Sequence, residues 1–106
     1  MTTKENLTET IKKSRPNVKD STVKMYVSNL MKLMKLFDKE NLKFLKDIEK
    51  IKDKLSELHY TTQRNYYNSI IVYLMSITEK PNEDKTIKEY NSIRDDLNKK
   101  YEEEQA

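Results

Sequence analysis

The sequence predicts an all-α protein, built as one compact bundle of four to five helices. Glycine is absent and proline occurs only twice among 106 residues, and these are the two residue types that most disfavour helix interiors. Apolar residues recur at spacings of three and four over several long segments, as one face of a helix requires, and the alternation typical of strands is nowhere sustained. With 35% hydrophobic and 37% charged residues, each helix is expected to bury a thin stripe.

A short first helix is expected over segment 3–14. Thr2 stands at capping-box spacing before a glutamate, and Leu7 and Ile11 lie one turn apart. Pro16 disfavours helix at the residue before it, which ends the segment. With only two apolar contacts, this helix depends on a partner surface.

The clearest helix is expected over segment 20–37, with Asp20 or Ser21 as its N-cap. Its predicted buried stripe consists of Val23, Tyr26, Val27, Leu30, Leu33, Met34 and Phe37. A basic stripe on another face consists of Lys24, Ser28, Lys32 and Lys35. A buried stripe and a basic stripe therefore share one helix.

Two shorter elements follow. The stretch "NLKFLKD" is expected to form a single turn, and Asp47 then caps a helix over segment 47–58. The apolar stripe of that helix is Ile48, Ile51, Leu55 and Leu58. Its outer face alternates acids and bases, as a solvated surface does, and we assign it no function.

The stretch "HYTTQRNYYNSIIVYLMSI" predicts the next helix, with Thr61 or Thr62 as its N-cap. The expected buried stripe is Tyr66, Ile70, Tyr73, Leu74 and Ile77, widened by Tyr67, Ile71 and Val72. A stripe of this width predicts a central helix that is buried on more than one side.

A last helix is expected after Pro81, capped by Asn82 or Asp84. Its apolar stripe is sparse, and its final turns beyond about Asn98 are expected to stand free or fray. We therefore interpret residues 1–80 as the helical domain and residues 81–106 as a C-terminal helix.

Composition excludes several classes of function. The chain has one histidine, no cysteine and no glycine, so it offers no matched catalytic set and no phosphate loop of the Gly-rich type. No metal site of credible spacing is present, and we expect neither a cofactor nor a small-molecule substrate. His59 is interpreted as a helix-end or loop residue, with a phosphate contact as the alternative.

Charge is distributed unevenly although its sum is only +3. The stretch from Lys12 to Lys35 holds seven basic residues against one acid, whereas nine acids oppose six bases from Glu79 to the end. One end of the molecule is therefore suited to a polyanion. No hydrophobic leader and no run long enough to span a bilayer occurs, so an intracellular protein, in the cytoplasm or nucleus, without membrane association is expected.

Two helix starts carry clustered side-chain donors next to this basic segment. Helix N-termini offer unpaired amides and a partial positive charge to phosphate oxygens, and Thr, Gln and Arg side chains bind phosphates or base edges. Capping alone explains Thr61 or Thr62 equally well, but it does not require Arg64 or Lys24. The predicted DNA-contacting residues are Lys12, Lys13, Arg15, Lys19, Ser21, Thr22, Lys24, Tyr60, Thr61, Thr62, Gln63 and Arg64.

Most remaining large side chains are interpreted as packing residues. Tyr26, Tyr66 and Tyr73 fall on apolar stripes, and the methionines at positions 25, 31 and 34 are expected to pack as well. Tyr60 and Tyr67 fit either packing or contact with a nucleotide backbone.

The order of elements resembles the N-terminal core-binding domain of tyrosine recombinases, the phage-integrase family with a SAM-like fold. In that family a helix that starts with Ser or Thr carries a Tyr and then a Leu, matched here by Ser21 or Thr22, Tyr26 and Leu30. A later helix starts with Thr or Ser and runs into an apolar stripe, matched by Thr61 and Thr62. The resemblance covers about residues 5–80 and includes no signature peptide.

The resemblance implies a domain that clamps duplex DNA opposite a separate catalytic domain, with other recombinase protomers as partners. The family's catalytic residues belong to that second domain, and Tyr101 is not assigned as a nucleophile. The chain is then either the N-terminal part of a longer recombinase, with residues 81–106 leading towards the catalytic domain, or a stand-alone relative that binds without cutting. The competing hypothesis is a helical protein–protein interaction module without DNA affinity.

Overall fold

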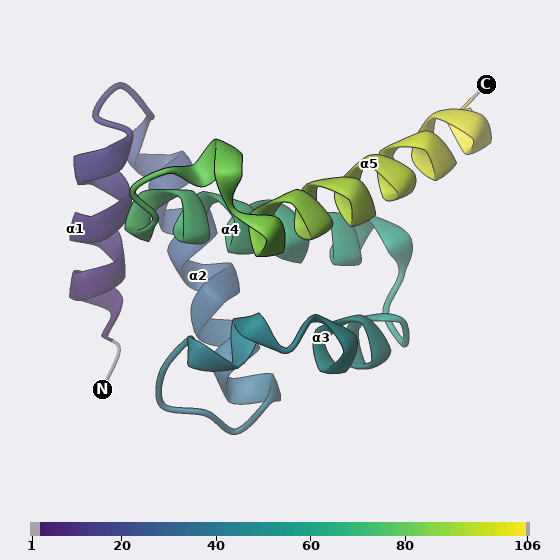
Figure 1. The fold of residues 1–106 in the computed structure, drawn as a ribbon, viewed down its shortest axis with the longest axis horizontal. Coiled ribbons are helices and arrows are strands. Elements are labelled where there is room, and N and C mark those ends of the chain that lie inside the picture. The colour runs from purple at the N-terminus through teal and green to yellow at the C-terminus, as the bar shows by residue number, and fades with distance from the viewer. Residues whose placement is uncertain (1–2, 106) are drawn as a thin grey trace.

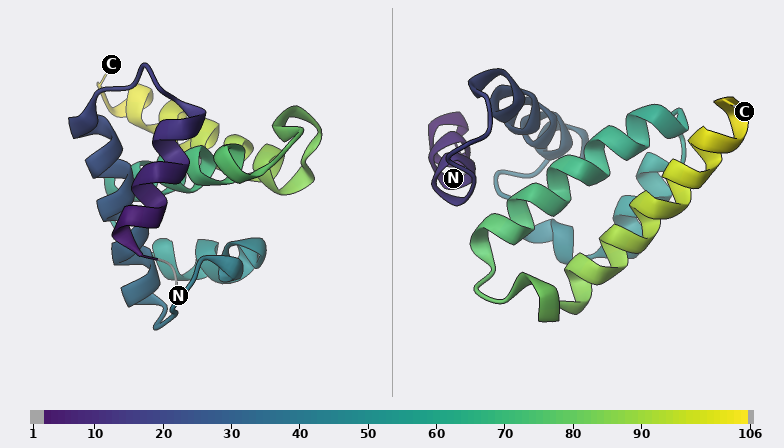
Figure 2. Two further views of the ribbon diagram at one scale, coloured as in Figure 1. Left: turned by 90° about the vertical axis from the view of Figure 1, so that its left-hand side faces the viewer. Right: turned by 90° about the horizontal axis from the view of Figure 1, so that it is seen from above.

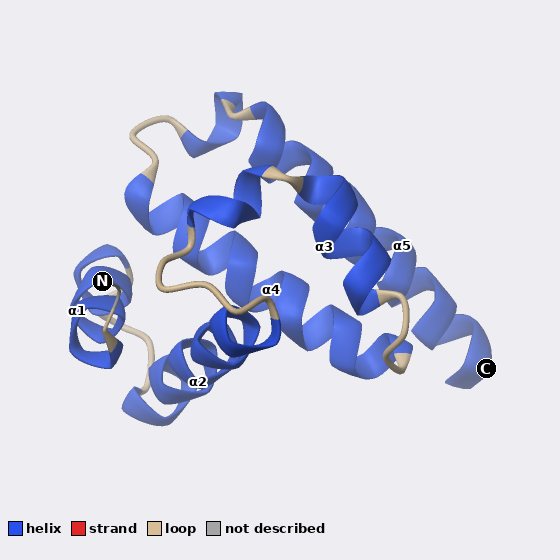
Figure 3. Ribbon diagram, turned by 90° about the horizontal axis from the view of Figure 1, so that it is seen from below, coloured by secondary structure: helices blue, strands red, loops and turns tan. Residues whose placement is uncertain are grey.

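A computed structural model describes residues 3–105 of the chain, and this part is all-helical with no strand (Figure 3). The prediction of an all-α bundle is therefore confirmed. Five α-helices and two 3-10 helices follow one another as α1 (Lys4–Ser14), α2 (Asp20–Leu36), η1 (Lys43–Lys46), α3 (Ile48–Leu55), α4 (Tyr60–Ile77), η2 (Pro81–Glu83) and α5 (Lys85–Gln105).

Helix α4 lies at the centre of the molecule, as its wide apolar stripe predicted. It contacts α1, α2 and α5, and its contact with α5 is the most extensive between any two elements. The segment around η2 turns the chain back, so that α5 runs antiparallel along α4 (Figures 1 and 2). The turn at η1 and helix α3 lie below these two helices (Figure 1).

The buried face of α4 is centred on Ile70 and on the residues predicted to widen the stripe, and it departs from the prediction towards Ile77. Tyr67, Ile70, Ile71 and Val72 are buried, whereas Ile77 is 55% exposed. Tyr66, Tyr73 and Leu74 are only partly buried. The face is rotated because α1, α2 and α5 pack on three sides of α4, which a single helical stripe cannot reveal.

A buried polar pair joins α2 to α4. The Asn29 side-chain amide donates to Ser69 Oγ at 3.0 Å, and that hydroxyl donates to the Asn65 carbonyl at 3.0 Å. Ser69 is fully buried, so both bonds compensate for its loss of water. The Asn29–Ser69 bond joins the two helices and so helps to fix their register.

Side-chain caps were predicted correctly at two helices and incorrectly at two others. Asp47 Oδ1 accepts from the Lys50 amide at 3.4 Å, and Asp84 Oδ1 accepts from the Ile87 amide at 3.0 Å. The N-cap of α2 is Lys19, which makes no side-chain cap bond, and both Asp20 and Ser21 lie inside the helix. The N-cap of α4 is His59.

At the N-terminus the cap of α1 is Thr3, whose Oγ1 accepts from the Asn6 amide at 3.2 Å. The predicted cap Thr2 lies outside the described residues. Leu7 and Ile11 are buried as expected, and they supply the whole buried face of this helix.

Helix α5 continues as a helix to Gln105, and within its final turns Tyr101 contacts Arg64 whereas Glu102 and Glu103 are exposed. One further expectation is wrong. Met25 is 48% exposed and does not pack, whereas Met34 is buried. Met25 lies beyond the buried arc of α2, where the helix turns to solvent.

One buried hydroxyl ties α5 to the segment below it. Tyr90 is fully buried, and its OH donates to the Leu45 carbonyl of η1. Burial raises the pKa of Tyr90 well above its ordinary value and raises the pKa of Tyr67 to about 12. Both phenols are therefore neutral at physiological pH, and the Tyr90 hydroxyl acts as a donor.

Tyr90→Phe should lower the free energy of unfolding by about 1–3 kcal/mol, because the Leu45 carbonyl loses its donor in a buried place. Urea unfolding measures this loss. Tyr66→Phe is the matched control, since Tyr66 is only partly buried, and its effect should stay within about 0.5 kcal/mol. Equal effects of the two variants would contradict this role of the Tyr90 hydroxyl.

Candidate nucleic-acid interface

The predicted DNA-contacting residues form two separate groups in the structure. The first, from Lys12 to Lys24, surrounds the corner between α1 and α2, and the second is the start of α4, from Tyr60 to Arg64. Both helix starts lie on the same long side of the molecule in the right-hand view of Figure 2. They stand at different ends of its longest axis, as Figure 1 shows.

At the α1–α2 corner one lysine is paired with an acid. Lys12 Nζ lies 3.0 Å from Asp20 Oδ1, and this partner lowers the pKa of the Asp20 carboxyl. Lys13, Lys19 and Ser21 are exposed, and Thr22 is partly exposed. The corner thus offers exposed cations, but its acid neutralises part of the positive charge.

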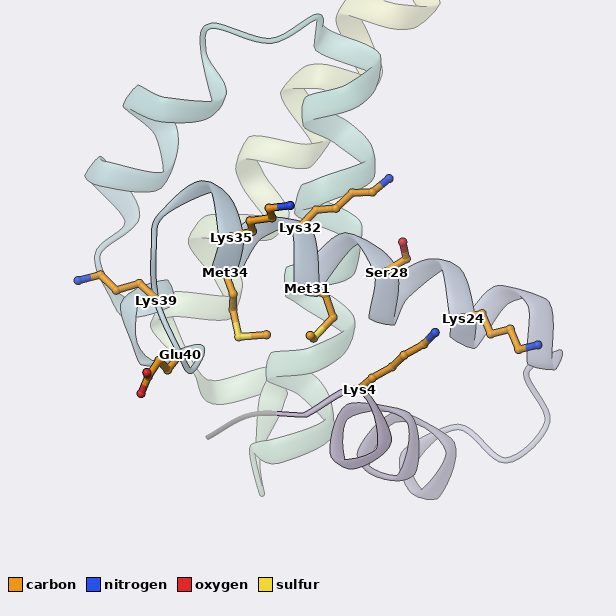
Figure 4. A pocket seen from close by; sticks show the side chains of 9 residues that line it. All are labelled: Lys4, Lys24, Ser28, Met31, Lys32, Met34, Lys35, Lys39 and Glu40. Carbon is orange, nitrogen blue, oxygen red and sulfur yellow. The ribbon is translucent and has the colours of Figure 1, made fainter.

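A stripe of lysines without an intervening acid lies along α2 from Lys24 to Lys35. Lys24, Ser28, Lys32 and Lys35 are all exposed, and together they line a groove of about 650 Å³. Lys4 of α1 and Lys39 of the following loop line the same groove, with Glu40 as the one acid among its lining residues (Figure 4). We call Lys4, Lys24, Ser28, Lys32, Lys35 and Lys39 the basic face.

The lysines of the basic face have no salt-bridge partner within the described part of the chain. The four α2 positions were predicted as a stripe and Lys24 as a contact, whereas Lys4 and Lys39 were not predicted. Lys4 joins the face only because α1 folds back along α2. Lys39 follows Asp38, whose positive φ of 54° turns the chain after α2.

The floor of the groove is apolar. Met31 and Met34 point into it, and Lys4 reaches from α1 towards α2 (Figure 4). Lys32 and Lys35 extend away from this floor towards solvent (Figure 4). The cations are therefore free to meet anions outside the groove, while the two thioethers could accept an apolar group within it.

The polar residues at the start of α4 cap that helix. The Thr61 amide donates to His59 Nδ1 at 3.3 Å, and Gln63 Nε2 donates to the Leu58 carbonyl at 2.7 Å. His59 therefore replaces Thr61 or Thr62 as the cap, because the helix begins at Tyr60, earlier than predicted. Thr62 stays exposed.

Arg64 and Tyr60, at the start of α4, contact the C-terminal part of α5. The Arg64 guanidinium lies 4.5 Å from the centroid of the Tyr101 ring, which is a cation–π contact. Tyr60 lies 6.2 Å from the same ring, and Lys100 lies 5.7 Å from the ring of Tyr60. Arg64 and Tyr60 thus have a structural role that no local sequence pattern predicts, because Tyr101 is 37 positions beyond Arg64.

Other site types find no support in the described residues. No group of three or more His, Cys, Asp or Glu is arranged to hold a metal ion in this part of the chain. None of its helices combines the length and the apolar content needed to cross a bilayer.

Comparisons with protein-family models, curated proteins and solved structures give no match.

Tyr101→Ala should release the end of α5, since it removes the ring that Arg64 and Tyr60 contact. Amide hydrogen exchange beyond Leu97 should then become about fivefold faster, the effect of losing about 1 kcal/mol of local stability. Tyr101→Phe keeps the ring and should keep the protection. Unchanged exchange in the alanine variant would contradict this role of the aromatic contact.

Proposed function

We propose that the chain binds duplex DNA through the basic face of α2, as the core-binding domain of a site-specific tyrosine recombinase and without catalysis by this chain. The observation that carries the proposal is the cluster of exposed, unpaired lysines, Lys24, Lys32 and Lys35, joined by Lys4 and Lys39. Cations in such an array release counterions from the phosphate backbone when they bind it.

The surface of α3 shows what a lysine-rich face looks like when acids neutralise it. There Lys50 lies 3.7 Å from Asp47 Oδ2, and Glu49 and Asp53 stand between the lysines. The basic face has no such interleaving along α2, since no acid stands between Lys24 and Lys35; Asp20 lies near its Lys24 end, and Glu40 is the one acid that lines the groove. This contrast within one chain supports an anionic partner for α2, because a general abundance of lysine would not by itself leave α2 without acids.

The recombinase assignment rests on the sequence pattern: a Ser/Thr-started helix with Tyr26 and Leu30, and a later Thr-started helix that runs into an apolar stripe. The SAM-like type of fold belongs to the same proposal, and so do other recombinase protomers as partners. The five α-helices are compatible with it.

Within this proposal, the α2 side of the predicted site contributes most of the contacts. Lys13 and Lys19 at the α1–α2 corner extend the basic face, and Thr62 is the exposed residue at the start of α4. Arg64 is occupied by Tyr101, so its contribution to DNA affinity should be smaller than that of Lys24.

A second function is favoured by the groove floor. Met31 and Met34 present polarizable, adaptable surface below the lysines, which would suit an acidic amphipathic helix of another protein. This interaction module would bind no DNA at about 0.15 M salt.

The triple variant Lys24→Ala, Lys32→Ala, Lys35→Ala tests the proposal by fluorescence anisotropy with a random duplex at several salt concentrations. For the unmodified chain, log affinity should fall with log salt at a slope of about −4 to −5. The variant should bind more weakly, and its slope should be flatter by about 2.7, the value for three lost phosphate contacts.

A matched control removes the same charge elsewhere. Lys46→Ala, Lys52→Ala, Lys54→Ala replaces three exposed lysines of η1 and α3 and should retain nearly the full slope. If both triple variants flatten the slope equally, only net charge matters and the basic face is not the interface. If the unmodified chain does not bind, the DNA proposal fails.

A further inference from the structure

A second hollow lies between the helices, on a different face of α2 from the basic face. It has a volume of about 360 Å³, within the range of small-molecule sites. We call it the arginine pocket. Its lining residues are Arg15, Tyr26, Asn68, Ile71, Val72, Met75, Asn91 and Arg94.

Two guanidinium groups line the arginine pocket without adequate partners. Arg15 Nη2 donates only to the sulfur of Met75, at 3.8 Å, and sulfur is a weak acceptor. Arg94 Nη2 contacts the exposed Asp95 at 3.4 Å, a distance at which an exposed pair contributes little. No acid is among the lining residues, so no carboxylate within the pocket balances the two cations, and in the described part of the chain only Asp95, outside the pocket, pairs with either of them.

The position of Arg94 is unusual for an arginine. It lies on the side of α5 that carries Tyr90 and Leu97, the residues that pack on the core. Its Nε is buried and has no hydrogen-bond partner within the described part of the chain. Unpaired buried donors are rare in folded proteins, and each calls for an explanation.

Three neutral polar side chains complete the lining. Asn68 of α4, Asn91 of α5 and Tyr26 of α2 are partly exposed, and none makes a side-chain hydrogen bond within the described residues. Amide, phenol and guanidinium groups that are available to a ligand therefore surround one space, supplied by three helices and by Arg15 after α1. The buried Ile71 and Val72 add an apolar wall.

We propose that the arginine pocket binds a phosphoryl group, with Arg15 and Arg94 as its charged ligands. A phosphoryl group has several acceptor oxygens that point in different directions, as donors from four sides require, and guanidinium groups bind such oxygens in a fixed fork geometry. A carboxylate, with two oxygens in one plane, would leave part of this donor set unused.

The phosphoryl group could belong to a phosphorylated small molecule or to a nucleic-acid backbone, and the chemistry of recognition is the same. Tyr26 lies two positions from Lys24 and from Ser28, so it points to another side of α2. The pocket is therefore separate from the basic face, and its existence does not depend on the proposed binding of DNA there.

Titration of the full chain with inorganic phosphate, followed by NMR shifts of the backbone amides and of the arginine Nε–H groups, tests the pocket. Saturable shifts should centre on Arg94 and its pocket neighbours, with acetate at equal ionic strength giving weaker binding. Arg94→Gln should weaken phosphate binding by about tenfold or more, the usual effect of losing one charge-assisted bond.

Arg15→Gln provides a second variant outside the helices, in case Arg94→Gln fails to fold, and it should weaken binding similarly. Lys52→Gln on α3 makes the same charge change at a distance and should leave phosphate binding unaltered. Shifts that never saturate, equal binding of acetate, or full binding by both arginine variants would overturn the proposal.

Measuring the affinity of the Arg94→Gln variant for duplex DNA distinguishes the two sources of the phosphoryl group. Weaker duplex binding identifies a backbone phosphate as the source, whereas unchanged duplex binding with lost phosphate binding identifies a small molecule. Both results support the pocket. If the unmodified chain does not bind duplex DNA, the phosphate titration can still be carried out and interpreted. The failure of one proposal is therefore distinguishable from the failure of the other.

Discussion

Burial of α4 on three sides is the constraint on which the rest of this structure depends. The chain has few apolar residues, so a core forms only if one helix is shared by several partners. Helix α4 contacts α1, α2 and α5, and its residues Ile70, Ile71 and Val72 are all buried, so each partner then needs only a narrow stripe. Because α2 gives one side to this core, its opposite side is left to lysines, and the basic face is a direct consequence of how little of α2 is buried.

The sequence was sufficient for the helices and for most of the core. Spacing placed Leu7 and Ile11 inside, and it identified the stripe of α2 from Val23 to Met34. It was insufficient where several elements compete for one residue. The rotation of the buried face of α4 depends on three partners, and the ordered end of α5 depends on an Arg64–Tyr101 contact between residues far apart in the chain.

In the candidate sites, too, features of a single helix were predictable from the sequence, whereas features that depend on contacts between helices were not. The stripe of Lys24, Ser28, Lys32 and Lys35 is a property of one helix, and periodicity is enough to find it. The recruitment of Lys4 and the pairing of Arg15 with Arg94 in one pocket are tertiary, since they arise where α1 and α5 meet the α2–α4 pair. The start of α4 shows what composition alone does not reveal. His59 and Gln63 form hydrogen bonds with backbone groups there, while its predicted contacts with DNA stay a prediction.

The central claim is that an unneutralised lysine face on α2 is where this chain meets DNA. Mapping of amide shifts in a two-dimensional NMR titration with a short duplex, at about 0.1 M salt, tests it most directly. The account predicts that the largest shifts follow α2 from Lys24 to Lys35 and include Lys4, while α3 stays nearly unchanged. Shifts concentrated on α3, or no shifts at all, would contradict it.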